Sequence, residues 1–229
     1  MDKFVSCIVA AGGSGSRMKS DVNKIFLKIC EVPVIAHTLN VLQNSNFVSE
    51  IIVSAREEDI VRICQIAEGF NITKLKAVVR GGATRGESVL CAKEEVSESA
   101  DIIMVHDAAR PLVSEEIIEN TVASALQNGA AACGVKPKCT LKSVTAGGFV
   151  ADTVDREKTV EIQTPQAFKK ELFDEMYSFC TDIIKASTDD CMLAERCGVC
   201  ACVTEGSYRN IKITTPEDLE IAEMLLRRR

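Results

Sequence analysis

The stretch KFVSCIVAAGGSGSRM, residues 3–18, decides the fold class of this sequence. Its first part, residues 3–10, is a short run rich in Val and Ile, which is typical of a strand buried on both faces of a parallel sheet. A glycine- and serine-rich segment follows at once. Glycines allow positive φ and close approach of the backbone, so successive N–H groups can hold phosphate oxygens in one concavity. The loop is therefore a candidate anion site, and a solvated glycine turn is the alternative.

Further apolar runs of this kind alternate with segments in which apolar residues recur three and four positions apart. The expected strands are residues 3–10, 50–55, 74–80, 101–106 and 130–135. The expected helices are residues 33–43, 57–70, 86–96 and 114–129, the last capped by Ser114 and ended by Gly129. This alternation predicts an α/β fold, with a mostly parallel sheet and helices on both faces. Ligands of such sheets bind at the carboxyl ends of the strands, which selects the loops after the first, third and fourth strands.

The alternation breaks in the second half of the chain. Residues 139–155 are two β-rich runs around Ala146-Gly147-Gly148, which predicts a hairpin in a projecting arm at about 137–158. We expect the chain to return through a strand at 159–165, a helix near 169–184, a capping segment STDD (187–190), a strand containing Cys200, the short NIKIT (210–214) and a helix opened by Pro216. One domain of residues 1–229 is expected to hold all of these elements.

Composition limits the classes of function. The chain has 229 residues, 46% of them hydrophobic, which suits one globular domain with a substantial core. Its net charge of −6 argues against a nucleic-acid partner or an anionic membrane surface, because both need a broad basic face. No apolar run reaches the roughly 18 residues of a membrane span, and no signal peptide is recognised, so we expect a cytoplasmic protein. Any anion site must be local.

The sequence contains eleven cysteines, an odd number, and they lie inside apolar runs. We expect reduced thiols in the core rather than a disulfide scaffold. Cys191, Cys197, Cys200 and Cys202 are close in sequence, so a metal site is one interpretation. The other is that Cys200 and Cys202 share one face of a strand as small hydrophobic residues, and it is favoured because no His lies nearby.

The motif VHDAARP follows the fourth expected strand. A carboxylate at this position, Asp107, can hold a divalent cation against phosphates, and Arg110 is available for an anion. The alternative is a capping Asp beside a surface Arg. We assign no chemistry to His106 or His37. The glycine loop matches neither a P-loop nor a dinucleotide-binding G-x-G-x-x-G motif, which argues against those two standard phosphate sites.

These motifs occur together in an order that carries a resemblance over nearly the whole chain. They are AAGGSGSRM (10–18), Lys24, GG (81–82) with Ser88, HDAARP (106–111), TVDR (153–156), QTPQAF (163–168), STDD (187–190) and NIKITTPEDL (210–219). The sequence resembles the 2-C-methyl-D-erythritol 4-phosphate cytidylyltransferases of the non-mevalonate isoprenoid pathway. The resemblance implies a CTP-dependent, Mg²⁺-assisted nucleotidyl transfer that releases pyrophosphate. It also implies a Rossmann-like sheet in a homodimer whose hairpin arms embrace.

The resemblance also implies roles for individual residues. The catalytic residues would be Arg17, Lys24, Asp107 and Lys212, with Asp107 also near the metal. The CTP-binding residues would be Ala10, Ala11, Gly12, Gly15, Gly82, Ser88 and Ala108. The residues around the acceptor, a small sugar-alcohol phosphate, would be Arg110, Thr140, Arg156, Thr164 and Thr188, some of them lent by the partner's arm.

Two features differ from many members of that family. Asn23-Lys24-Ile25 stands where many have Pro-Lys-Gln, and the glycine loop is one residue longer than the compact form. The longer loop also resembles ribitol-5-phosphate cytidylyltransferases, which use the same nucleotide and a different acceptor, whereas TVDR favours methylerythritol. A non-catalytic nucleotide-binding regulator is a third hypothesis. The presence of Arg17, Lys24, Asp107 and Lys212 argues against it, because a module that only binds could lose one or more of them.

Overall fold

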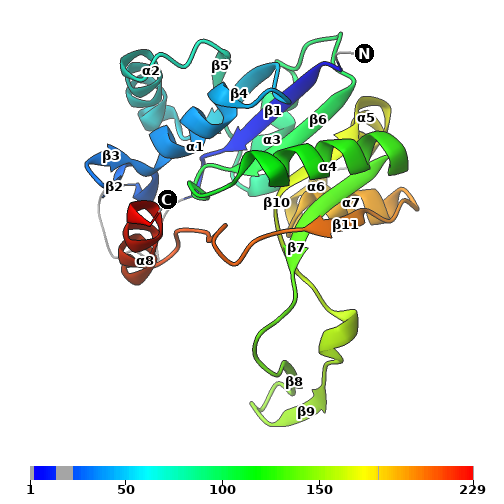
Figure 1. The fold of residues 1–229 in the computed structure, drawn as a ribbon. Coiled ribbons are helices and arrows are strands. Elements are labelled where there is room, and N and C mark those ends of the chain that lie inside the picture. Colours follow the sequence, from blue (N-terminus) through cyan, green and yellow to red (C-terminus); the bar gives the residue numbers. More distant parts are fainter. Residues whose placement is uncertain (1–2, 14–22, 180, 229) are drawn as a thin grey trace.

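The central feature of the computed structural model, which describes residues 3–13, 23–179 and 181–228, is a seven-stranded sheet (Figure 1). In spatial order its strands are β11 (Cys202–Glu205), β7 (Ala130–Val135), β10 (Glu161–Lys169), β6 (Ile102–Asp107), β1 (Val5–Ala10), β4 (Glu50–Ala55) and β5 (Leu75–Arg80). Within this sheet, all neighbouring strands are parallel except for β10, which runs antiparallel to both β6 and β7. The predicted mostly parallel sheet is confirmed.

The register brings the ends of β1 and β6 together. Ala10 pairs with Asp107, and Ala55 at the end of β4 pairs with Arg80 at the end of β5. Because β10 is antiparallel, its first half lies beside the carboxyl end of β6. Gln166 pairs with Val105, which precedes the last residue of β6, Asp107, by two positions. The carboxyl ends of the parallel strands and the start of β10 therefore form one rim.

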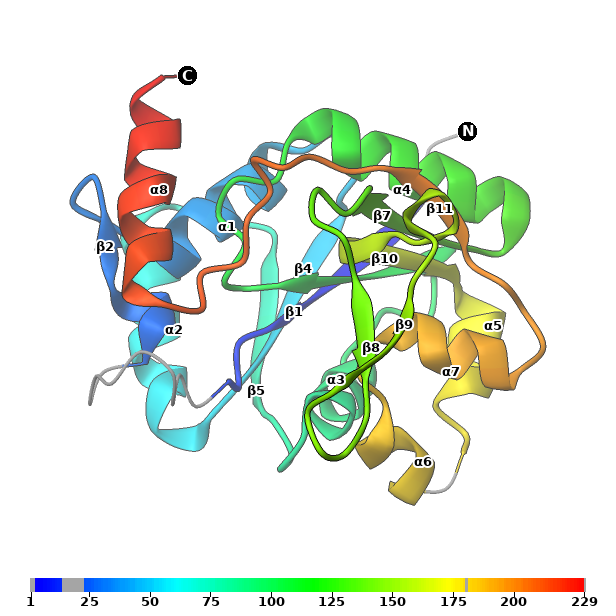
Figure 2. The same cartoon turned by 90° about the horizontal axis from the view of Figure 1, so that it is seen from below.

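Helices cover both faces of the sheet (Figure 2). Strand side chains alternate between two apolar clusters, as expected for a sheet that is buried on both sides. One face packs against α1 (Val34–Asn44), α2 (Ile60–Gly69) and α4 (Glu115–Asn128). The other face packs against α3 (Arg85–Lys93), α5 (Lys170–Met176), α6 (Thr181–Ala186) and α7 (Asp190–Arg196).

The C-terminal helix α8 (Pro216–Arg227) builds a third apolar cluster beside the sheet. It packs near the small two-stranded unit of β2 (Lys28–Ile29) and β3 (Val32–Pro33). Between β11 and α8 the chain is irregular, and the Ile213 N–H donates to Ala109 O at 2.8 Å. This bond holds the NIKIT segment against the loop that follows β6. No helix in the described part of the chain is long and apolar enough to cross a membrane.

A two-stranded hairpin projects away from the main sheet, as Figure 1 shows. It consists of β8 (Lys142–Val144) and β9 (Val150–Thr153), with Gly148 at φ 81° in the turn, a conformation that favours glycine. Every side chain of the two strands is exposed, including the apolar Val144 and Val150. The predicted hairpin is confirmed in position, and nothing in the described chain covers its apolar side chains.

Two predictions for the second half need correction here. The strand expected at 159–165 continues to Lys169, because Ala167 and Phe168 are buried between β6 and β7 beyond an irregularity in the register. The helix expected near 169–184 is therefore two shorter helices, α5 and α6, separated by a turn after Tyr177. The segment 210–214 forms neither a helix nor a strand.

The prediction for the cysteines is only partly right. The described cysteines are free thiols, and Cys7, Cys133 and Cys191 are buried, but several others are exposed. Cys200 precedes the strand, and Cys202 opens β11, which lies at the end of the strand order of the described sheet, next to β7. Both thiols are exposed, although α4 packs against β11 at Thr204, so the expectation that they behave as small core residues is wrong.

Candidate active site

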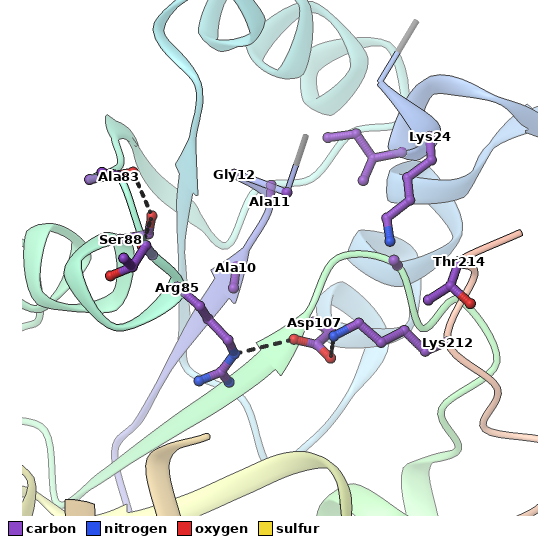
Figure 3. A pocket seen from close by; sticks show the side chains of 15 residues that line it. Ala10, Ala11, Gly12, Lys24, Ala83, Arg85, Ser88, Asp107, Lys212 and Thr214 are labelled. Carbon is purple, nitrogen blue, oxygen red and sulfur yellow. Dashed lines mark hydrogen bonds and ion pairs between the residues drawn. The ribbon is translucent and has the colours of Figure 1, made fainter. Parts of the chain in front are cut away.

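A cavity of about 360 Å³ opens at the rim where the parallel strands end (Figure 3). The loops after β1, β5 and β6 line it, as predicted, together with the turn at Lys24 and the NIKIT segment. Its lining residues are Ala10, Ala11, Gly12, Gly13, Lys24, Ile25, Gly82, Ala83, Thr84, Arg85, Ser88, Asp107, Ala109, Lys212 and Thr214.

The loops after β1 and β5 form one wall of this cavity. Ala11 is fixed by its N–H bond to Ser54 O at 2.8 Å, and a Cβ added at Gly12 would lie 3.4 Å from Ser88 Oγ. Gly82 has no room for a Cβ, which would lie 2.3 Å from Cβ of Glu87. At Gly12 and Gly82 the backbone itself therefore forms part of the cavity wall. The predicted Gly15 and Arg17 lie outside the described residues.

The start of α3 is held by a reciprocal cap. Thr84 Oγ1 accepts from the Glu87 N–H at 3.3 Å, while Glu87 Oε2 accepts from the Thr84 N–H at 3.0 Å. Ser88 Oγ donates to Thr84 O at 2.8 Å. These bonds fix the position of Ser88 against the glycines of the same loop.

Asp107 lies at the centre of a group of cations. Lys212 Nζ is 2.8 Å from Oδ2, Arg110 Nε is 3.5 Å from the same oxygen, and Arg85 Nε is 3.6 Å from Oδ1. Burial alone would raise the pKa of the Asp107 carboxyl, but its three cationic partners hold the pKa well below its usual range. Asp107 is therefore an ionised carboxylate at neutral pH.

Lys24 adds a further cation from a 3₁₀ turn, Lys24–Phe26. Asn23 orders this turn, because its Oδ1 accepts from the Ile25 N–H at 3.3 Å while its Nδ2 donates to Asp59 Oδ2 at 2.8 Å. Lys24 is largely buried, and Figure 3 shows its side chain directed into the cavity toward Asp107 and Lys212. The unusual Asn23 thus keeps Lys24 on the cavity wall.

The balance of charge around the cavity is positive. Among the described residues, Arg85, Arg110 and Lys212 surround Asp107, and Lys24 lines the same cavity. Arg85 also pairs with a second carboxylate, because its Nη2 is 2.7 Å from Oδ2 of Asp190. A chain of net charge −6 therefore has a local cationic basin. Such a basin suits a ligand with several phosphates.

A sequence profile of the 2-C-methyl-D-erythritol 4-phosphate cytidylyltransferase (IspD) family matches residues 5–228. This chain belongs to that family. It is accordingly an enzyme, a CTP-dependent nucleotidyltransferase. The match favours the methylerythritol acceptor over the ribitol acceptor that the sequence left open.

Relatives of the same name cover almost the whole cytidylyltransferase chain. The protein of Clostridium botulinum (strain 657) is 41% identical over 221 residues, 96% of both chains. That of Lysinibacillus sphaericus is 41% identical over 222 residues, 97% of this chain and 95% of its own. The crystal structure of 4-diphosphocytidyl-2C-methyl-D-erythritol synthase from Anaerococcus prevotii is 32% identical and has a TM-score of 0.86, with 99% of this chain and 97% of that chain covered.

The acceptor residues expected in this cytidylyltransferase are not gathered at the cavity of one chain. Thr164 is buried beside it, and its Oγ1 accepts from the Asp107 N–H at 3.0 Å. Thr188 is exposed before α7. Thr140 and Arg156 are exposed at the two ends of the hairpin arm, and neither lines the cavity. Within one chain, then, Thr140 and Arg156 lie apart from the cations.

Two further predicted site residues of the cytidylyltransferase, Ala108 and Arg110, contact the protein backbone next to the cavity. Ala108 is buried, and its N–H donates to Ala10 O at 3.0 Å. Arg110 Nη1 donates to Asn210 O at 2.7 Å, so this arginine joins the loop after β6 to the start of NIKIT. Neither residue lines the cavity. Their bonds hold in place the backbone of two segments that do line it, at Ala10 and after Asn210.

Burial lowers the pKa of His106, the neighbour of Asp107, to about 4. The ring is neutral at neutral pH, and its Nδ1 lies 3.0 Å from Oγ1 of Thr164. Since that hydroxyl oxygen already accepts from Asp107 N–H, its hydrogen is free to be donated to the ring. His106 is thus a buried hydrogen-bond partner of Thr164.

Sequence reasoning missed Arg85. It is the first residue of α3, its side chain is mostly buried, and it reaches Asp107 and Asp190. Burial disfavours the cation, yet Asp190 and Asp107 raise the pKa of Arg85 above its usual value. A signal was present, because Arg85 lies inside the selected loop RGGATRGES (80–88). Its direction toward Asp107 depends on the packing of α3, which the loop sequence does not reveal.

Proposed function

We propose that this protein transfers the cytidylyl group of CTP to 2-C-methyl-D-erythritol 4-phosphate, forming 4-diphosphocytidyl-2-C-methyl-D-erythritol and pyrophosphate. The observation that carries the proposal is the basin of cations around Asp107 at the rim of the sheet, in a chain of this family. The whole chain, residues 1–229, acts as one nucleotidyltransferase domain with the arm at about 137–158 as an insertion.

The reaction joins two anions. An oxygen of the acceptor phosphate attacks the α-phosphorus of CTP in line, the new P–O bond forms, and the bond to the leaving pyrophosphate breaks. The acceptor phosphate is already ionised near neutral pH, so no strong general base is required. Positioning and stabilisation of charge do most of the work. The cavity offers lysines and arginines for this purpose.

Lys24 and Lys212 bind the reacting phosphates and stabilise the charge that builds on their oxygens. Arg17 is proposed to act with them, as the resemblance implies. The nucleotide is held by the backbone of the glycine loops and by Ser88, through the set Ala10, Ala11, Gly12, Gly15, Gly82, Ser88 and Ala108. The pyrimidine base is proposed to lie between these loops, where polar groups of their backbone would distinguish its edge.

Asp107 is the residue that would hold Mg²⁺. Its carboxylate is ionised and lines the cavity, and Mg²⁺ typically takes one or two carboxylates together with phosphate oxygens and water. The donor set therefore fits this ion. When bound, Mg²⁺ supplies a Lewis acid that neutralises phosphate charge. Lys212 pairs with Asp107 in this structure and is proposed to turn to the phosphates when they bind.

The acceptor is proposed to bind between two chains of a homodimer. Arg110, Thr164 and Thr188 come from the chain that holds CTP, and Thr140 and Arg156 come from the partner's arm. Exposed Val144, Phe149 and Val150 support this arrangement, because an isolated hairpin is marginal in water and gains stability from a partner. The cytoplasmic location expected from the sequence stays a prediction.

Nucleotide specificity tests the proposal. Purines are larger than the proposed slot and present a different hydrogen-bonding edge, and buried polar groups left unpaired can cost factors of about 10⁴. We expect pyrophosphate release with CTP to exceed that with ATP or GTP by orders of magnitude, at equal concentrations with Mg²⁺ and the acceptor. Comparable turnover with ATP would contradict the cytidylyl assignment.

A further inference from the structure

Two segments meet beside the cavity. The nucleotide segment, residues 82–88, contains the start of α3, and the acceptor segment, residues 184–190, contains Thr188 and the start of α7. They touch backbone to backbone, because a Cβ added at Gly86 would lie 2.3 Å from O of Ile184 and 3.0 Å from Oγ of Ser187. The two segments are therefore in direct contact at Gly86.

A buried ion pair joins the same two segments. Nη2 of Arg85 is 2.7 Å from Oδ2 of Asp190, and Asp190 is fully buried. Arg85 uses another nitrogen, Nε, toward Asp107 at 3.6 Å. A planar guanidinium can contact two carboxylates through separate nitrogens, whereas lysine offers one charged nitrogen. Arg85 therefore links the acceptor segment to the carboxylate in the cavity.

Asp190 is itself held from the interior. The Tyr177 hydroxyl donates to Oδ1 at 2.5 Å, and the Asp190 N–H donates to Oε1 of Gln166 at 3.0 Å. Burial and the Asp190 carboxylate raise the pKa of Tyr177, so its hydroxyl stays protonated. Oδ1 of Asp190 therefore accepts a hydrogen bond, whereas its Oδ2 meets Arg85 as an ion pair and makes no hydrogen bond of good geometry. A connected chain of contacts runs from Tyr177 through Asp190 and Arg85 to Asp107.

We propose that Asp190 is a positioning residue for the transfer: through Arg85 it fixes the acceptor segment against the nucleotide segment. This inference rests on the proposed function. Thr188 lies just before Asp190, and Ser88 lies one turn after Arg85, so the pair joins the segments assigned to the two substrates. In-line attack depends on their separation, and a misplacement of about 1 Å can cost about 10²-fold in rate.

Asp190→Asn tests the inference, because it keeps the shape of the side chain and removes its charge. CTP binding is measured by calorimetry without acceptor, and pyrophosphate release is measured over a range of acceptor concentrations. We expect kcat/KM for the acceptor to fall about 10²-fold while the Kd for CTP stays close to the wild-type value. A residue with only a structural role would lower the melting temperature and leave both constants of the folded protein unchanged.

Tyr177→Phe is the milder variant, which removes only the hydroxyl bonded to Asp190. We expect kcat/KM for the acceptor to fall about tenfold, the usual scale for one hydrogen bond to a charged group. The matched control is Lys185→Ala. It removes an ion pair between the same two segments, 3.5 Å from Nζ to Oε1 of Glu87, in which the lysine side chain is 46% exposed. Exposed pairs contribute little, so its kinetics should match the wild type.

The outcomes are distinguishable. Wild-type kinetics in folded Asp190→Asn would overturn the positioning role, and so would an equal loss in CTP affinity and acceptor turnover, which would mark a defect of the nucleotide segment alone. If Asp190→Asn does not fold, Tyr177→Phe decides: unchanged kinetics would overturn the role. A wild-type protein that releases no pyrophosphate would contradict the proposed function itself.

Discussion

Nζ of Lys212 lies 2.8 Å from Oδ2 of Asp107, so the segment before α8 delivers a cation to the end of β6. The backbone bond from Ile213 N–H to Ala109 O fixes this approach without using the lysine side chain. Lys212 is 40% exposed and Asp107 8%. The lysine therefore reaches both the buried carboxylate and the open space where phosphates are proposed to bind.

Lys212→Ala should lower turnover by about 10²- to 10³-fold, the usual scale for loss of one preorganised electrostatic contact. The fold should persist, since the Ile213 bond remains. Pyrophosphate release and circular dichroism check the two expectations. Lys169→Ala is the control. This exposed lysine ends β10 and pairs with Ile102, the first residue of β6, so it lies at the opposite end of the strands from the cavity. Near-wild-type turnover in folded Lys212→Ala would remove Lys212 from the catalytic set.

Gly82→Ala should weaken CTP binding. The added Cβ would lie 2.3 Å from Cβ of Glu87, so the loop must move away from the start of α3. Overpacking typically costs about 1–3 kcal/mol, and if that cost falls on the loop that binds CTP, Kd should rise about 5- to 150-fold. Calorimetry measures this. At Gly69, a Cβ has no neighbour within 4 Å, so Gly69→Ala should bind CTP normally. Equal affinity in both variants would contradict the close-approach argument.

Glu50, the first residue of β4, should make the stability of the fold sensitive to acid. Burial alone would raise the pKa of its carboxyl, but bonds from Ser6 Oγ (2.6 Å) and from the N–H and Oγ of Ser97, together with Lys76, lower it from its ordinary value of 4.5. A carboxylate with a lowered pKa contributes stability that is present above the unfolded-state pKa and lost as the pH falls through the folded-state pKa.

The stability advantage of the wild type over Glu50→Gln should therefore be full at about pH 7 and shrink once the pH falls below about 4.5. Urea unfolding of both proteins across this range measures the difference in unfolding free energy. An advantage that does not depend on pH would show that the charge of Glu50 is not what stabilises the fold.

Mixing two inactive variants tests whether the sites are shared. Lys24 lines the cavity of its own chain, whereas Arg156 lies exposed at the end of the arm. Lys24→Ala and Arg156→Ala should each lose about 10²-fold or more in turnover. In heterodimers, one of the two composite sites receives both intact residues, so mixing should restore activity. No recovery, with heterodimers confirmed by mass, would contradict a composite site.

Much of the fold follows from local patterns. Ser114 caps α4 by accepting from the Ile117 N–H, and Gly129 ends the helix at φ 89°, as their positions predict. The buried Val and Ile runs predict β1, β4 and β6 because these strands pack on both faces. The continuation of β10 past Pro165 could not be predicted in this way, because it depends on pairing with both β6 and β7.

The site residues likewise fall into those that local sequence patterns identify and those that depend on tertiary packing. Asp107 and Gly82 were identifiable because they directly follow strands or lie in glycine loops. Arg85 and Asp190 were not, because their pairing joins the starts of α3 and α7, which are far apart in the chain. The roles of Thr140 and Arg156 came from the resemblance alone, and a single chain keeps both away from the cavity.

Comparison of acceptors tests the central claim most directly. With CTP and Mg²⁺, pyrophosphate release is followed separately with 2-C-methyl-D-erythritol 4-phosphate, with ribitol 5-phosphate and without acceptor, and the product mass is determined. The account predicts release with the methylerythritol phosphate, matched by its CDP-linked product, and little with the other two. Release with ribitol 5-phosphate but not with methylerythritol phosphate, or none with either, would contradict it.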